Sequence, residues 1–214
     1  MEDPSLPESC SIDDSICFIS LREKSEIEQK VVEIAESMKS RGHEMGDVQI
    51  LAPTREWSDN LNLHLKATFN PVPDGQDLKA FTIGDYVIYT KNDYVNKLHN
   101  GQVGIISSTT EKTITVNYNG QAICHSKTDW EHLSLAYSLT IHKAQGSEYP
   151  IVIIPIHESM GRALSRNLIY TAVTRSKEKC IIVGSEQALL DALGRTLLHT
   201  HKSMLAERLR DMIK

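Results

Sequence analysis

Residues 135–150 read Leu-Ala-Tyr-Ser-Leu-Thr-Ile-His-Lys-Ala-Gln-Gly-Ser-Glu-Tyr-Pro, and the apolar run Ile-Val-Ile-Ile follows at 151–154. A hydroxyl, an imidazole, an ammonium, an amide and a carboxylate therefore stand directly before a run whose apolar character predicts a buried strand. Loops at strand ends are where ligands bind in α/β proteins. The pattern favours a functional site; a plain polar connection between a helical turn and a strand is the alternative.

A second stretch, residues 164–179, reads Leu-Ser-Arg-Asn-Leu-Ile-Tyr-Thr-Ala-Val-Thr-Arg-Ser-Lys-Glu-Lys, with apolar residues at helical spacing. Residues 136–148 resemble motif V of the superfamily 1 DNA helicases, and residues 168–177 resemble their motif VI. The version Thr-Ile-His-Lys-Ala-Gln-Gly-Ser-Glu at 140–148 is most similar to the RecD/TraA group, which includes the exodeoxyribonuclease V alpha subunit.

The regions on either side predict an α/β fold. Apolar runs predict strands at 15–20, 48–52, 151–156 and 180–183, and amphipathic spacing predicts helices at 23–41, 164–176, 185–193 and 200–214. A further helix is expected to contain Leu61, Leu65 and Ala67 and to stop at Asn70-Pro71. Strands that alternate with helices indicate a parallel sheet. The resemblance implies the second RecA-like domain of a helicase, a parallel sheet flanked by helices.

Residues 79–134 have a different character. They contain short, partly alternating runs separated by turn residues at Asn92, Asn100 and Asn119, which predict a small antiparallel β-barrel of the Src-homology-3-like type. The RecD-like helicases carry such a barrel before motif V, and residues 84–85 and 92–94 resemble theirs. We therefore expect an extended arm at 1–14, one discontinuous RecA-like domain at 15–78 and 135–214, and an inserted barrel at 79–134.

The chain has 214 residues and a formal charge of -5, and residues 1–30 alone account for this excess with eight acidic and three basic side chains. The remainder is neutral, so any nucleic-acid contact must come from local geometry. No apolar run approaches the roughly 20 residues that a membrane span needs. The acidic N-terminus lacks a signal-peptide pattern, and we expect a cytoplasmic protein without membrane partners and without a metal site.

The chain lacks the residues that hold nucleotide phosphates. A phosphate-binding loop needs Gly-x-x-x-x-Gly-Lys-Ser/Thr, and none of the 11 glycines is followed by lysine. No apolar strand ends in the Asp-Glu pair that holds magnesium. We therefore expect ATP and magnesium to be bound mainly by an N-terminal half that is missing here, and the chain to be inactive alone.

The resemblance implies nucleotide contacts for five residues. Arg175 corresponds to the arginine finger, Glu148 to a ribose contact, and Gly146 to a close backbone approach to the phosphates. Gln145 couples nucleotide to DNA, and Arg55 lies in the motif IV-like run Leu-Ala-Pro-Thr-Arg at 51–55. The alternatives are structural: Arg175 and Arg55 as ordinary cations at helix ends, and Glu148 paired with a surface lysine.

Thr140, His142 and Lys143 are expected to contact single-stranded DNA, through phosphate bonds or base stacking. For Thr140 the alternative is a cap on a helical turn. The implied function is the C-terminal motor half of an ATP-dependent DNA helicase, with 5′ to 3′ movement implied by the resemblance alone. Its expected partners are single-stranded DNA, the N-terminal RecA-like domain, and nuclease or repair subunits.

Two other functions remain open. A helicase half could serve as a stand-alone module that binds single-stranded DNA or protein without hydrolysis. An unrelated nucleotide-binding α/β enzyme would need a glycine-rich loop after its first strand, and Ser20-Leu21-Arg22-Glu23 offers none.

Overall fold

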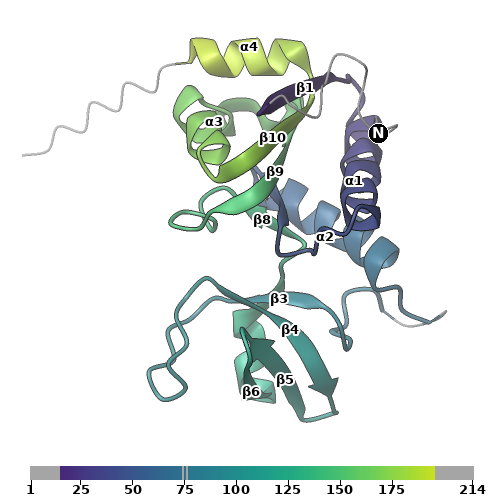
Figure 1. Ribbon diagram of the computed structural model, residues 1–214, viewed down its shortest axis with the longest axis vertical. Helices are drawn as coiled ribbons and strands as arrows, with labels where there is room; N and C mark the ends of the chain where they lie inside the picture. The colour runs from purple at the N-terminus through teal and green to yellow at the C-terminus, as the bar shows by residue number, and fades with distance from the viewer. Residues whose placement is uncertain (1–14, 74, 76, 196–214) are drawn as a thin grey trace, which may run out of the picture.

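The computed structural model describes residues 15–73, 75 and 77–195, and arranges them as a parallel sheet with helices and a separate antiparallel sheet (Figure 1). The arm expected at 1–14 and the helix expected at 200–214 lie outside the described residues. Among the helices that are described, none has the length and apolar character needed to cross a membrane.

The parallel sheet has the strand order β1-β10-β9-β2-β8. Its strands are β1 (Ile16–Ser20), β2 (Val48–Ala52), β8 (Ser138–Thr140), β9 (Tyr149–Ile156) and β10 (Ser176–Gly184). This confirms the parallel sheet expected from the sequence, although β9 and β10 begin earlier than predicted and β8 was not anticipated. The residues of β2 are all buried, as are the last six of β9, which explains why these strands are almost entirely apolar.

Helices cover both faces of this sheet. α1 (Lys24–Ser40) and α2 (Arg55–Phe69) follow β1 and β2, whereas α3 (Arg166–Val173) and α4 (Glu186–Gly194) follow β9 and β10 (Figure 1). α1 joins β1 to β2 and α3 joins β9 to β10 in the opposite direction along the sheet, so the right-handed rule for such connections places α1 and α3 on opposite faces. α2 packs with α1, and α4 packs with α3. The helix expected at 164–176 is shorter than predicted, and a 3-10 helix (Glu158–Ala163) precedes it.

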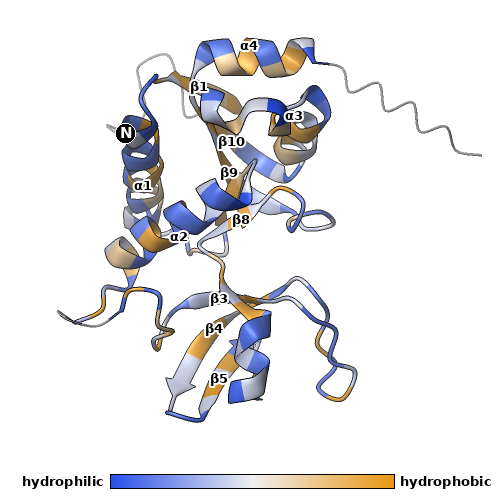
Figure 2. Ribbon diagram, turned by 180° about the vertical axis from the view of Figure 1, so that it is seen from behind, coloured by the Kyte–Doolittle hydropathy of each residue, from blue (hydrophilic) through white to orange (hydrophobic). Residues whose placement is uncertain are grey.

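Serine and threonine side chains begin three of these helices. Thr54, Ser165 and Ser185 each accept a hydrogen bond from the backbone N–H three residues later, at α2, α3 and α4. Figure 2 shows the result of the apolar spacing, with hydrophilic and hydrophobic patches alternating along α1 and α2 and a hydrophobic β9 between the layers. The expected amphipathic pattern of these helices is confirmed by burial of Ile27, Val31, Ile34 and Met38 in α1.

α2 completes the hydrogen bonding of the edge strand β8. The side-chain amide of Asn62 donates to the carbonyl oxygen of Ser138 at 2.9 Å and accepts from its N–H at 2.9 Å. Ser58 Oγ donates to the same carbonyl at 3.0 Å. A side chain thus supplies the partners that another strand would give, which allows a short strand to end the sheet.

The inserted residues form an antiparallel sheet with the order β6-β5-β4-β3-β7. Its strands are β3 (Tyr86–Tyr89), β4 (Gln102–Thr109), β5 (Thr113–Tyr118), β6 (Gln121–Ser126) and β7 (Leu133–Leu135), with a 3-10 helix (Lys127–His132) before β7. Among the described residues no pairing joins the edge strands β6 and β7, so closure into a Src-homology-3-like barrel is not confirmed. We call residues 86–135 the inserted sheet.

β3 is buried from both sides because it contributes to both hydrophobic cores. Val87 and Tyr89 face the core of the inserted sheet, whereas Ile88 packs into the core of the parallel sheet. Tyr89 and Tyr118 are buried in the core of the inserted sheet, while Tyr94 is 84% exposed. Successive side chains of β3 point to opposite sides, so this strand packs into both cores and holds the two sheets together.

Candidate nucleotide and nucleic-acid sites

The loop from Ile141 to Glu148 crosses from one end of the parallel sheet to the other. It leaves β8 at Thr140, which pairs with Ala52 at the carboxyl end of β2. It enters β9 at Tyr149, which pairs with Ser176 at the amino end of β10. Ile141 and Ala144 are buried and anchor the loop, and the polar residues between them remain exposed. A single loop thus carries side chains to both edges of the sheet.

Arg175 lies at the amino edge, where it contacts this loop. Its Nη1 donates to the carbonyl oxygen of Ser147 at 3.1 Å, and its Nε donates to the carbonyl oxygen of Thr171 at 3.2 Å. Tyr149 N donates to the backbone oxygen of Arg175 at 2.8 Å. Among the described residues no carboxylate forms an ion pair with Arg175, so neutral oxygens orient a guanidinium whose charge stays uncompensated.

Three other residues expected at the nucleotide belong to the loop that Arg175 contacts. Glu148 forms an ion pair of 3.5 Å with Lys177, and both side chains are 58% exposed. This is the surface lysine partner that was the structural alternative for Glu148. Gln145 is exposed, and Gly146 has a φ of 87°, a left-handed conformation that favours glycine. The structure brings Glu148 and Arg175 to the amino edge of the sheet, whereas Gln145 and Gly146 lie in the middle of the loop that leads there.

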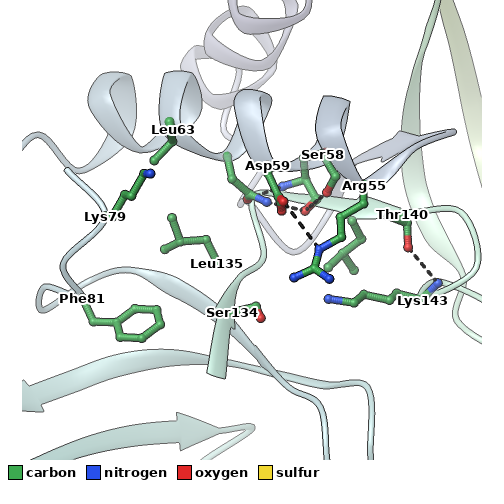
Figure 3. A pocket seen from close by; sticks show the side chains of 13 residues that line it. Arg55, Ser58, Asp59, Leu63, Lys79, Phe81, Ser134, Leu135, Thr140 and Lys143 are labelled. Carbon is green, nitrogen blue, oxygen red and sulfur yellow. Dashed lines mark hydrogen bonds and ion pairs between the residues drawn. The ribbon is translucent and has the colours of Figure 1, made fainter. Parts of the chain in front are cut away.

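A cleft of about 300 Å³ opens at the other end of the loop, between α2, β8 and the start of the insertion (Figure 3). Cations line its rim at Arg55, Lys79 and Lys143, and Phe81 contributes an aromatic ring. The remaining lining residues are Ser58, Asp59, Asn62, Leu63, Ser134, Leu135, Ser138, Leu139 and Thr140. We call this the basic cleft. Cations beside an aromatic ring and hydroxyl groups are the groups that bind single-stranded nucleic acid.

The charges at the rim influence one another. Arg55 is 88% exposed and its Nε lies 3.6 Å from Asp59 Oδ2, an exposed pair of small energetic value. The pKa of Lys143 is lowered, mainly by desolvation at the cleft wall and to a smaller extent by the positive charge of Arg55. The negative charge of Asp59 opposes this shift. Figure 3 shows the side chains of Arg55 and Lys143 extending toward each other. Two cations held together attract an anion such as a phosphate.

The sequence prediction and the structure differ in how they group these residues. Thr140 and Lys143 line the basic cleft, and Thr140 Oγ1 accepts from Lys143 N at 3.3 Å, which is the capping role considered as its alternative. Arg55 lies with them, although the sequence grouped it with the nucleotide residues at the opposite edge. His142 is exposed on the same loop but does not line the cleft.

Sequence reasoning missed several residues of the cleft. Phe81 and Lys79 belong to residues 79–134, which were interpreted only as the inserted barrel. Ser58 and Asn62 were visible as polar residues within the apolar pattern of α2, and burial of polar side chains on a helix face is a signal of specific hydrogen bonding.

The sequence of this chain is similar to those of several known proteins. The profile described as UvrD-like helicase C-terminal domain matches residues 135–183. The chain is 38% identical over 170 residues to the ATP-dependent RecD2 DNA helicase of Deinococcus radiodurans, an alignment that covers 77% of this chain and 24% of the relative. The chain belongs to the RecD-like superfamily 1 helicases.

This RecD-like chain is also 33% identical over 132 residues to the RecBCD enzyme subunit RecD of Mycolicibacterium smegmatis, covering 61% of the chain and 23% of the relative. It therefore spans about a quarter of the length of these relatives. A Bacteroides Pif1 helicase solved with ADP-AlF3 and single-stranded DNA has a similar fold, with a TM-score of 0.50 at 17% identity over 78% of this chain and 52% of that one.

Proposed function

We propose that this RecD-like chain is the C-terminal motor region of an ATP-dependent DNA helicase that moves 5′ to 3′ on single-stranded DNA. The observation that carries the proposal is the loop at 141–148. One end of it meets Arg175, and the other end borders the basic cleft. Residues for a nucleotide and residues for a strand are therefore parts of one connected segment.

At the nucleotide edge Arg175 would contact the phosphates and Glu148 the ribose of ATP. A guanidinium suits this role because its charge is permanent and planar, and here neutral oxygens orient it. ATP and magnesium would be held mainly by a preceding RecA-like domain, which completes the site when it closes on this edge. Gln145 and Gly146 would lie at the junction, since they connect the nucleotide edge to the strand edge.

At the strand edge we assign Arg55, Lys143 and Thr140 to phosphates of single-stranded DNA, which moves Arg55 from the nucleotide to the nucleic acid. His142 is exposed on the same loop and would meet a base or phosphate beyond the cleft. Lys79 lies across the cleft from these cations, where it would contact a further phosphate of the same strand (Figure 3).

The partners would be single-stranded DNA and the preceding RecA-like domain of the same protein. Nuclease or repair subunits are further partners, a proposal supported by the relative named as a subunit of the RecBCD enzyme. A binding module without hydrolysis is the second candidate, because the basic cleft is built from residues of this chain alone.

The test compares DNA-stimulated ATP hydrolysis by the full-length protein with that of its Arg175→Ala variant. Loss of an arginine finger lowers the rate by about 10³ to 10⁵ while ATP still binds. Arg166→Ala is the matched control, since Arg166 begins α3, the helix that precedes Arg175, and is exposed. Magnesium-dependent hydrolysis by the 214-residue chain alone would contradict the division of the site between two domains.

A further inference from the structure

A buried ion pair lies where the chain passes from the parallel sheet into the inserted sheet. Lys66 Nζ on α2 is 2.5 Å from Asp85 Oδ2, immediately before β3, and both side chains are 0% exposed. Lys66 also donates to the carbonyl oxygen of Ala80 at 2.5 Å. Burying two charges is costly, and their attraction repays the cost only where further hydrogen bonds satisfy the remaining polar atoms.

Asp85 has those further bonds, and they come from separate parts of the chain. Its Oδ1 accepts from Asn70 Nδ2 at 2.8 Å and from the Tyr137 hydroxyl at 3.0 Å. Its Oδ2 accepts from the N–H of Thr82 at 2.8 Å. Asn70 is the C-cap of α2, and Tyr137 stands between β7 and β8. One carboxylate is thus bound by α2, by the entry to the insertion and by its exit.

The backbone at Asp85 belongs to the insertion, whereas its side chain faces α2. Gly84 N donates to the carbonyl oxygen of Ile106 at 2.8 Å, and Ile106 N donates to that of Asp85 at 2.9 Å, which extends the pairing of β3 with β4. Gly84 has a φ of +91°, and this left-handed turn aims the next side chain back at α2. Asp85 therefore links the inserted sheet to α2, which packs on the parallel sheet.

We propose that the Lys66–Asp85 pair is a clamp that fixes the orientation of the inserted sheet on the parallel sheet and thereby sets the width of the basic cleft. The walls of that cleft belong to both parts: Asn62 and Leu63 lie on α2, whereas Phe81 and Ser134 lie at the two ends of the insertion. Lys66 and Asp85 are positioning residues in this proposal, which does not depend on what the cleft binds.

The clamp predicts a specific change in mobility. The experiment measures the distance between two fluorophores by single-molecule energy transfer. The fluorophores are attached to azidophenylalanine, which replaces Gln29 on α1 and Lys112 in the turn between β4 and β5; both positions are exposed. The single-molecule distance distribution is expected to be one narrow peak. Lys66→Met and Asp85→Asn each leave a buried group unpaired, and the peak is expected to broaden while amides of β5 stay protected from hydrogen exchange.

Hydrogen exchange supplies the quantitative readout. In Lys66→Met the amides of Gly84 and Ala136, at the entry and exit of the insertion, are expected to exchange on the order of 100 times faster than in the parent chain. Lys30→Met is the matched control, because it removes the same charge from the partly exposed pair with Glu33 on α1. Its distances and exchange are expected to stay unchanged.

The opposite results would overturn the clamp. A broad distribution in the parent chain would do so, as would an unchanged peak and unchanged exchange in a folded Lys66→Met chain. If Lys66→Met does not fold, Asn70→Ala removes one anchor of Asp85 and keeps the ion pair. The proposal requires a smaller broadening in that variant, and no broadening at all would reject it.

Discussion

Arg175 donates from Nη1 to the carbonyl oxygen of Ser147 at 3.1 Å, which attaches the segment between α3 and β10 to the loop between β8 and β9. The same loop follows Thr140, the last residue of β8, on the wall of the basic cleft. Contacts made by Arg175 at one edge and by Thr140 at the other therefore act on one short segment with two buried anchors, Ile141 and Ala144. This arrangement separates the roles of neighbouring residues, and mutations can test each role.

Replacing Glu148 by alanine tests the nucleotide edge. The ion pair with Lys177 is exposed on both sides, so its loss is expected to change the free energy of unfolding by about 0 to 1 kcal/mol. A hydrogen bond from a ribose hydroxyl to a carboxylate is worth about 1.5 to 3 kcal/mol, and ATP affinity of the full-length protein is expected to fall accordingly. Lys177→Ala is the control, and an equal loss of affinity in that variant would assign the effect to the ion pair.

Arg55→Ala and Lys143→Ala test the phosphate contacts of the basic cleft. Each is expected to weaken binding of a poly-thymidine oligonucleotide and to reduce the slope of log affinity against log salt by about 0.7, the value for one phosphate contact on a single strand. Fluorescence anisotropy at several salt concentrations gives this slope. Lys112→Ala removes an exposed cation from the inserted sheet away from the cleft lining, and it should leave the slope unchanged.

Phe81 tests base stacking at the cleft. Its ring lines the cleft but also packs against the core of the inserted sheet, so a change to alanine would mix two effects. Phe81→Leu keeps most of the apolar packing and removes the ring. Oligonucleotide affinity is expected to fall by about 1 to 3 kcal/mol, as for loss of one stacked base, and Phe81→Tyr is expected to restore it. Equal affinity for the leucine variant and the parent would exclude stacking.

His125 predicts an acid sensitivity of the inserted sheet. It is buried, and its Nε2 lies 2.9 Å from the Tyr118 hydroxyl. Burial lowers its pKa below the ordinary 6.5, although the nearby carboxylates of Asp129 and Asp93 oppose this. The unfolded chain therefore binds the proton more readily, so the stabilisation is complete above about pH 6.5 and is lost as the pH falls toward the lower folded pKa.

This loss amounts to at most about 1.4 kcal/mol per pH unit for one group. Urea unfolding followed at pH 7.5 and at pH 5.5 measures it. His125→Gln can keep a hydrogen bond to Tyr118 but does not titrate, and its stability is expected to change less between the two pH values. The same pH dependence in both proteins would assign the effect to other groups.

Much of the parallel sheet was predictable because burial leaves a local pattern. α1 shows Ile27, Val31, Ile34 and Met38 at helical spacing, and β9 shows an apolar run that burial on both faces requires. β8 escaped prediction because it is three residues long and its partners are β2, far back in the chain, and the side chain of Asn62. No local signal reports such partners.

The sequence by itself determined the α/β class, the antiparallel character of the insertion and the family, since hydrophobic periodicity and two motifs express them locally. Only the tertiary structure decided which site residues meet. Arg55 and Thr140 come together because parallel pairing aligns the carboxyl ends of β2 and β8. Lys66 and Asp85 meet because a folded chain must pair charges that it buries, and their separation in sequence leaves no periodic trace.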